Sequence, residues 1–195
     1  MNRMNEREVV KLSIPEAKAI YDNHMVKDFP DSERKPFSVI EKGMKNGSYL
    51  VFGYKESCDV EYIAYAILIK TDNDYLFDYL AVIDRKRNSG IGAEFLKKVS
   101  VYVGKCDSII GEVEDPDYAK TEEERNLQER RYRFYLRNGV IDTGLKVKLF
   151  GVDYRVLEVD LGYAHSKEET AVLYKKHYKT HLPLLLYIRK VKVKK

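Results

Sequence analysis

The sequence predicts a mixed α/β fold in a single domain, with antiparallel strands in its N-terminal half and one parallel βαβ crossover in its middle. Three observations predict it. Short runs of β-branched and aromatic residues follow one another closely early in the chain, with turn-forming residues between them. A helix that opens at two glycines then separates two strands, and a right-handed crossover of this kind makes such strands parallel. Helices and strands alternate in the remaining half, and 195 residues suffice for one domain with a full core.

The first elements are a short strand and two helices. Residues 9–12 are predicted to form the strand. Ser13 and Glu16 have the spacing of a capping box, in which the two residues satisfy each other's backbone N–H groups. A helix is therefore expected to begin here and to run to about residue 27. A second helix is predicted over residues 37–45, where an Asn-Gly pair ends it.

Three apolar stretches follow, over residues 49–54, 60–69 and 75–83. Short polar turns link them, which favours an antiparallel meander. Their almost continuous apolar character is typical of strands covered on both faces, so we expect helices on each side of the sheet.

The crossover is predicted to consist of a helix over residues 90–103 and a strand over residues 108–113. The helix has apolar residues at helical spacing, which predicts one buried stripe. The stripe consists of Ile91, Phe95, Val99 and Tyr102.

The C-terminal half begins with a second capping box, Thr121 with Glu124, which predicts a helix to about residue 138. Alternating residues over 146–150 and 154–159 then predict a C-terminal hairpin around a turn at 151–153.

Ser166 and Glu169 cap a last helix before Pro183, and residues 184–193 are predicted to form a final strand. We therefore expect one domain over residues 1–195, with a core over about 8–160 and an extra helix and strand over 161–195. A strand at the edge of a sheet can pair with another subunit, which would allow a homodimer.

The composition is that of an ordinary globular protein, with 44% apolar and 34% charged residues. No apolar run approaches the roughly 18 to 20 residues that cross a bilayer, and residues 1–10 lack the apolar core of a signal peptide, so no membrane partner is expected. The two cysteines, Cys58 and Cys106, favour a reducing interior and hence the cytoplasm. The chain has a formal net charge of +4, and most of the excess basic residues lie at the C-terminus. No aromatic-rich binding motif accompanies them, so nucleic acid is not favoured as a partner.

A candidate phosphate site lies where the strand over residues 75–83 leads through a loop into Gly90-Ile91-Gly92 and a helix. A helix N-terminus offers unpaired N–H groups and a partial positive charge, and glycine lets the backbone approach an anion. Arg87 could add a charge-assisted hydrogen bond. A Walker P-loop is absent, and a Rossmann fingerprint would need a glycine where Phe95 stands. The alternative is a loop that only starts a helix.

Three segments resemble, in chain order, motifs of the GNAT superfamily of acetyltransferases. Residues 80–96 resemble its motif A, whose signature of Arg or Gln, two residues, Gly, one residue, and Gly or Ala is matched by residues 87–92. Residues 109–113 resemble the strand that follows, and residues 133–139 resemble the end of the next helix. The match covers roughly residues 49–159.

The resemblance implies an enzyme that transfers the acetyl group of acetyl-CoA to a primary amine by direct attack in a ternary complex. It also implies which backbone groups hold the coenzyme. The pantetheine arm would pair with the strand end formed by Leu80, Ala81 and Val82. The pyrophosphate would be wrapped by the amides of Arg87, Asn88, Ser89, Gly90, Ile91 and Gly92. Two positions depart from the family pattern, with Val140 in place of an aromatic residue and Gln128 in place of an asparagine.

Acetyl transfer to an amine needs a base for the ammonium, a polarised carbonyl and an acid for the departing thiolate. The resemblance implies that Tyr135 is the acid and that a backbone N–H near Val82 polarises the carbonyl. Two carboxylates interrupt apolar strands, and either could relay a proton through water; we favour Glu112 over Asp78 as the base, and a water chain or another group stays open as the alternative. The alternatives are that Tyr135 is a core aromatic and that each carboxylate bonds a neighbouring amide or basic side chain.

Other chemistry finds little support in the sequence. His177 and His181 have a zinc-binding spacing on a helix, but no Cys or Glu completes a ligand set, so no metal is expected. Neither cysteine has an identifiable His partner, which argues against a catalytic thiol.

Eight acidic residues between positions 112 and 129 favour a cationic acceptor, either a small molecule or a peptide amine, because a negative rim attracts cations. The alternative is a solvated helix start, where acidic residues favour the helix dipole. Two other functions stay open. The protein could be a non-catalytic acyl-CoA-binding module that regulates a partner, or an acetyltransferase associated with RNA.

Overall fold

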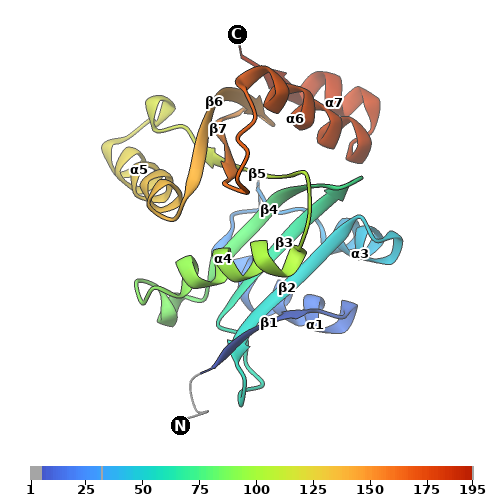
Figure 1. The fold of residues 1–195 in the computed structure, drawn as a ribbon, viewed down its shortest axis with the longest axis vertical. Coiled ribbons are helices and arrows are strands. Elements are labelled where there is room, and N and C mark those ends of the chain that lie inside the picture. Colours follow the sequence, from blue (N-terminus) through green and yellow to red (C-terminus); the bar gives the residue numbers. More distant parts are fainter. Residues whose placement is uncertain (1–5, 32, 195) are drawn as a thin grey trace. The chain divides into compact units, whose positions relative to one another are not determined.

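The computed structural model describes residues 6–31 and 33–194, which form two compact units (Figure 1). Half of the N-terminal segment considered above, residues 1–5 of 1–10, lies outside the described residues, as does Lys195 of the basic end. The first unit takes in the chain up to residue 70 and residues 77–105. The second takes in residues 71–76 and residues 106–195, so the boundary passes through one strand, β4.

The first unit contains four strands and the helices around them. In chain order its elements are β1 (Arg7–Lys11), α1 (Ile14–Ile20), the π-helical turn η2 (Tyr21–Met25), α2 (Val26–Asp28), α3 (Phe37–Asn46), β2 (Tyr49–Glu56), β3 (Ala64–Thr71), β4 (Asp74–Val82), the 3-10 turn η3 (Asp84–Lys86) and α4 (Ile91–Val103).

The second unit adds four strands and three α-helices. Its elements are β5 (Ser108–Glu114), the 3-10 turn η4 (Pro116–Tyr118), α5 (Glu122–Arg137), β6 (Val140–Leu149), β7 (Val152–Val159), α6 (Lys167–His181), α7 (Leu184–Lys190) and β8 (Val191–Val193).

The strands pair in the order β1-β2-β3-β4-β5-β7-β6-β8. Strands β1, β2 and β3 form the expected antiparallel meander, with Val9 opposite Tyr54 and Phe52 opposite Ala66. The pair β4–β5 is parallel and the remaining pairs are antiparallel. The predicted mixed α/β fold with one parallel crossover is therefore confirmed.

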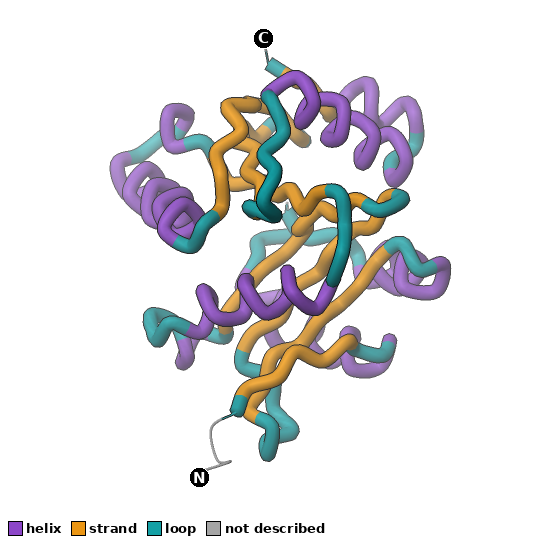
Figure 2. Tube along the Cα trace, in the orientation of Figure 1, coloured by secondary structure: helices purple, strands orange, loops and turns teal. Residues whose placement is uncertain are grey.

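Burial in the first unit explains why its strands lack polar alternation. Six of the eight residues of β3 from Ala64 to Ile69 are buried without interruption. Figure 2 shows α4 in front of the strands of this unit and α1 and α3 behind them. The rings of Tyr54 and Phe95 stack at 5.0 Å between centroids, which joins β2 to α4. Helix α4 thus buries Ile91, Phe95 and Val99 as predicted, while Tyr102 is half exposed and packs edge-on against Phe52.

Local caps determine where several helices begin. The Glu16 carboxylate accepts hydrogen bonds from the N–H and the hydroxyl of Ser13, so α1 begins as predicted. Ser166 and Glu169 form the same arrangement at α6. At α5 the hydroxyl of Thr121 accepts from the Glu124 N–H as expected, but the Glu124 carboxylate accepts from the N–H of Lys120.

Three predicted boundaries were wrong. The strand expected over 60–69 begins only at residue 64, and Val60 is 95% exposed. The hairpin turn consists of Phe150 and Gly151, both with positive φ, so β6 and β7 pair up to Leu149 opposite Val152. Strand β6 also begins earlier than expected, at Val140, and is irregular between residues 142 and 145.

The final strand predicted over 184–193 is wrong for most of its length. Residues 184–190 form helix α7, and only residues 191–193 form a strand, β8. The carbonyl of Pro183 accepts hydrogen bonds from the N–H groups of Leu186 and Tyr187, both at 2.9 Å, and so starts the helix. Proline suits a helix start, and an apolar run of this length does not by itself distinguish a helix from a strand. No helix among the described residues is long and apolar enough to cross a membrane.

Candidate functional site

The turn between β4 and α4 has the backbone shape that an anion site needs. Strand β4 ends at Val82, and the chain passes through η3 to an exposed turn before α4 begins at Ile91. Asn88 and Gly90 both have positive φ, at 60° and 81°. A Cβ added at Gly90 would meet no atom within 4 Å, so the backbone angle rather than crowding calls for glycine there.

The N-terminus of α4 has no side-chain cap. The hydroxyl of Ser89 donates to the carbonyl of Lys86 at 2.5 Å and is therefore turned away from the helix. The first intrahelical bond runs from the Glu94 N–H to the Gly90 carbonyl, so the N–H groups before Glu94 lack helical partners. Helices α1 and α6 use a serine and a glutamate at the same positions, as described above. Helix α4 thus presents its first amides to a ligand.

Arg87 lies in this turn but is already engaged. Its guanidinium is 2.6 Å from Asp28 and 2.9 Å from Asp84, and its Nε donates to the Val82 carbonyl at 3.1 Å. A phosphate would compete with these carboxylates for the guanidinium. Lys86, one residue earlier, makes no ion pair among the described residues, although the pKa of Glu61, lowered first by its hydrogen bond with Arg85, is also lowered by the charge of Lys86. It was not among the residues predicted to bind the coenzyme. It is the cation that this turn leaves available to a phosphate.

In the second unit, two tyrosines of α6 hold the favoured carboxylate, Glu112 of β5. The hydroxyl of Tyr174 donates to Glu112 Oε1 at 2.6 Å, and that of Tyr178 lies 2.8 and 3.0 Å from the two carboxylate oxygens. Burial, together with the charge of Glu112, raises the pKa of Tyr174 well above its ordinary value, so its phenol stays protonated and donates. Glu112 is therefore a hydrogen-bond acceptor in a fixed orientation.

Asp78 of β4 has a different environment, in the first unit. Its carboxylate lies 2.6 and 2.8 Å from the ammonium of Lys35, which precedes α3. Burial lowers the pKa of Lys35, but the charge of Asp78, its hydrogen bonds and the two nearby phenols of Tyr49 and Tyr79 together outweigh burial, so the pKa is raised. Asp78 therefore bonds a basic side chain, which was the alternative to a role as catalytic base.

Tyr135, the candidate acid, lies near the end of α5. Its side chain is half-buried, with its ring 5.2 Å from that of Phe134. Burial raises the pKa of its phenol, against the opposing charge of Arg131. The hydroxyl makes no hydrogen bond to any residue within 6–31 or 33–194. It is thus a protonated, half-buried donor whose position in the chain matches the family motif.

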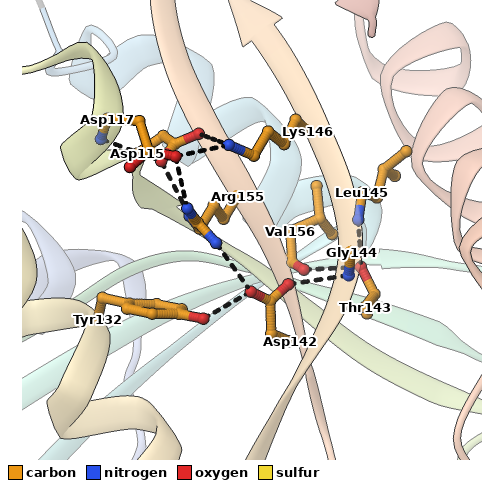
Figure 3. Close-up of polar contacts among 10 residues, drawn as sticks. All are labelled: Asp115, Asp117, Tyr132, Asp142, Thr143, Gly144, Leu145, Lys146, Arg155 and Val156. Atoms are coloured by element: carbon orange, nitrogen blue, oxygen red, sulfur yellow. Dashed lines mark hydrogen bonds and ion pairs between the residues drawn. The ribbon is translucent and has the colours of Figure 1, made fainter. Parts of the chain in front are cut away.

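Half of the eight acidic residues between positions 112 and 129 form ion pairs within 3 Å with basic side chains, and Figure 3 shows two of these residues, Asp115 and Asp117. Asp115, which is buried, lies 2.9 Å from both Arg155 and Lys146, and Asp117 lies 2.8 Å from the same two residues. Two further pairs lie outside the figure. These are Glu114 with Arg131 at 2.5 Å and Glu129 with Arg133 at 2.6 Å.

The two histidines on α6 are used inside the unit. The Nδ1 of His177 and the Nε2 of His181 each lie 2.8 Å from the Thr71 hydroxyl. Burial lowers the pKa of His177 to about 4, so its ring is neutral near pH 7. No group of three or more His, Cys, Asp or Glu side chains in the described part of the chain could hold a metal ion.

Comparison with known proteins addresses the fold. No protein-family model matches the sequence, and no curated protein sequence matches it. A GNAT-family acetyltransferase structure from Bacteroides thetaiotaomicron matches with a TM-score of 0.67 at 18% identity, over 89% of this chain and 98% of that one. The chain has the GNAT fold.

Two further structures with the GNAT fold are similar to it. The ribosomal-protein-S18-alanine N-acetyltransferase of Escherichia coli matches with a TM-score of 0.60 at 14% identity, over 82% of this chain and 97% of that one. A GNAT-family acetyltransferase from Elizabethkingia anophelis with acetyl-CoA bound matches with a TM-score of 0.52 at 14% identity, over 80% and 98%. This GNAT likeness covers more of the chain than residues 49–159, over which the sequence motifs could be aligned.

Proposed function

We propose that the protein is an N-acetyltransferase that takes the acetyl group from acetyl-CoA and passes it to a primary amine. The observation that carries the proposal is the uncapped N-terminus of α4 directly after β4, in a chain with the GNAT fold. An anion bound there gains several backbone N–H donors and the positive end of the helix dipole. A similar structure was solved with acetyl-CoA bound, which supports this coenzyme as the acetyl donor.

The coenzyme would be held chiefly by the backbone. The pyrophosphate would accept hydrogen bonds from the amides of residues 87–92, with Lys86 as a nearby cation. The pantetheine arm would extend along residues 80–82 as an additional strand. Arg87 would either exchange a carboxylate for a phosphate or stay with Asp28 and Asp84 and fix the shape of the turn. Backbone recognition requires the turn geometry, which depends on glycine at position 90.

The reaction would be a direct transfer. The amine loses a proton, its nitrogen attacks the thioester carbonyl, the new N–C bond forms and the C–S bond breaks. The departing thiolate takes a proton, for which Tyr135 is the proposed donor because its phenol is protonated and makes no hydrogen bond within the described residues. A backbone N–H near Val82 is the proposed donor to the carbonyl oxygen.

Glu112 is the proposed base. Its carboxylate accepts two phenolic hydrogen bonds and is held as an acceptor, whereas Asp78 is matched with Lys35. A carboxylate can take a proton from an ammonium, either directly or through one water. Helix α6, which lies outside the motif resemblance, would then position the base through Tyr174 and Tyr178.

The acceptor is proposed to be a primary amine of a small molecule or a peptide. The expectation of a cationic acceptor depended on an acidic segment with few counter-charges. Four of its eight acidic side chains make ion pairs with arginine or lysine side chains from β6, β7 and α5 within 3 Å. Electrostatic steering by this segment is therefore expected to be weak, and we propose no selection of the acceptor by its charge.

The test has two stages. Thermal-shift measurements with acetyl-CoA, CoA and ATP should show a larger stabilisation by the first two. A panel of amines, including spermidine, lysine and a peptide with a free N-terminal alanine, is then scored for release of free thiol. Binding of the coenzyme without thiol release from any amine would favour the non-catalytic acyl-CoA-binding module. No stabilisation by either coenzyme would refute the proposal.

A further inference from the structure

The charge of this chain is divided unevenly along the sequence. Residues 170–195 contain eight lysines and arginines and no aspartate or glutamate. The other 169 residues carry a formal net charge of −4, although the whole chain has +4. The C-terminal end of the second unit is therefore strongly basic, and the rest of the sequence is acidic on balance.

Only some of these cations have a partner inside the unit. Lys176 lies 2.9 Å from Asp72 and 3.0 Å from Asp74, and Lys194 lies 2.5 Å from Asp153. Three exposed cations at the end of α7 and in β8 have no anionic partner among residues 6–31 and 33–194. These are Arg189, Lys190 and Lys192.

Exposed aliphatic side chains lie on the same short helix. Leu184 is 63% exposed, and Leu185 and Ile188 are each 61% exposed. On an α-helix at about 100° per residue, these three positions fall within one arc of roughly 100°. Figure 1 shows α7 beside α6 at the C-terminal end of the chain, and the two helices pack on each other. We call the six residues Leu184, Leu185, Ile188, Arg189, Lys190 and Lys192 the C-terminal surface.

We propose that the C-terminal surface docks on an anionic phospholipid membrane. Aliphatic side chains beside unpaired lysines match the boundary between acyl chains and phosphate headgroups. A second copy of the chain is a poor occupant, because a two-fold contact would bring the same cations together. Protein interfaces are depleted in lysine and favour aromatic residues, and single-stranded nucleic acid is bound with exposed aromatic rings. The C-terminal surface has three aliphatic side chains and no aromatic one. The exposed ring next to it, Phe150, whose N–H donates to the Lys190 carbonyl, is also typical of a membrane-facing surface.

Peripheral docking is compatible with the absence of a long apolar run, which bears only on spanning a bilayer. The apolar face of α7 would enter the headgroup region. Arg189, about 40° beyond the aliphatic arc, would meet lipid phosphates directly, whereas Lys190, about 120° from the arc, and Lys192 of β8 would add attraction at longer range. The proposal does not depend on the acetyltransferase activity, since none of its six residues belongs to the coenzyme turn or to the proposed catalytic groups.

Vesicle co-sedimentation tests it with the full chain. Vesicles of phosphatidylcholine with 30% phosphatidylglycerol should retain the protein at low salt, and vesicles of phosphatidylcholine alone should not. The charge-reversed variant Arg189→Glu/Lys190→Glu/Lys192→Glu should lose at least about 100-fold in vesicle affinity, since each cation near an anionic surface contributes about a factor of five. Its matched control, with the same change of charge at exposed positions of the first unit, should bind like the parent. That control is Lys27→Glu/Lys97→Glu/Lys105→Glu.

The apolar half of the C-terminal surface has its own variant, Leu184→Ser/Leu185→Ser/Ile188→Ser. It should lose about 10-fold or more in affinity, whereas serine at three exposed valines elsewhere should have little effect. Those control positions are Val60, Val101 and Val172. Unchanged thermal melting confirms the fold of each variant, and all six positions are exposed.

Four results would overturn the proposal. Retention by neither kind of vesicle, or equal retention by both at any salt concentration, excludes an anionic lipid surface. Vesicle binding that is unchanged in both the charge-reversed and the serine variant of the C-terminal surface shows that another part of the protein binds the membrane. Filter binding of transfer RNA that the charge reversal abolishes, without vesicle binding, identifies a nucleic-acid surface. A dimer in solution that the serine variant converts to monomer identifies a second copy as the occupant.

Discussion

Replacing Gly90 by alanine should weaken coenzyme binding far more than it weakens the fold. Gly90 has φ 81° and ψ −9°, in the left-handed region, and a Cβ there would meet no atom within 4 Å. The cost is therefore conformational, about 1 to 2 kcal/mol for a residue other than glycine. Alanine at position 90 either keeps the unfavourable backbone angle or shifts the turn to relieve it. A shift of the turn displaces the amides that begin α4.

The affinity loss follows from those amides. A hydrogen bond to a charged group contributes about 1.5 to 3 kcal/mol, so misaligning one or two donors to a pyrophosphate should raise the Kd for acetyl-CoA by roughly 10-fold to 1000-fold. The matched control is Gly47→Ala. Gly47 ends α3 with φ 79° and ψ 4°, and it too has open space around its missing Cβ.

Isothermal titration calorimetry with acetyl-CoA, together with thermal melting, separates the two effects. Both variants should melt a few degrees below the parent, because about 1 kcal/mol shifts the Tm of a chain of this size by roughly 2 to 4 °C. Only Gly90→Ala should lose affinity. If it binds acetyl-CoA as tightly as Gly47→Ala does, the pyrophosphate does not depend on this turn.

Three further predictions concern the chemistry. Tyr135→Phe should lower kcat by about 100-fold or more and leave the Kd for acetyl-CoA unchanged, whereas the control Tyr102→Phe should change neither. Equal kcat values in the two variants would show that Tyr135 is not the acid. Glu112→Gln should lower kcat by about 100-fold at neutral pH, and part of the activity should return at high pH, where the amine loses its proton without a base. Asp78→Asn should instead leave the Lys35 ammonium without its ion pair and lower the free energy of unfolding by about 3 kcal/mol. Raising the ionic strength from 20 to 300 mM should change kcat/KM for the acceptor by less than about threefold, and a steep fall would restore electrostatic steering of a cation.

Local signals predicted most helix starts and the crossover, because caps and turns are decided within a few residues. Ser13 with Glu16 and Ser166 with Glu169 are examples, and so is the glycine pair that opens α4. The helix α7 was missed because an apolar run after a proline fits a strand and a helix equally well. Its surroundings, rather than its residues alone, decide between them.

The site was predictable only in part, for a related reason. The carboxylates on the strands could be found because they interrupt apolar runs, but their partners are distant in sequence. Tyr174 and Tyr178 lie 62 and 66 residues from Glu112, and Lys35 lies 43 residues from Asp78. The same holds for the ion-paired residues between positions 112 and 129, where Asp115 and its partner Arg155 are 40 residues apart. Patterns within a few residues do not predict such pairs.

The most direct test of the central claim compares two donors that differ in the diphosphate. Calorimetry on the unmodified protein should give an affinity for acetyl-CoA at least about 100-fold above that for acetyl-pantetheine, which lacks the phosphates that the start of α4 is proposed to bind. Equal affinity for the two would show that the diphosphate contributes nothing, and the proposed coenzyme site would be wrong.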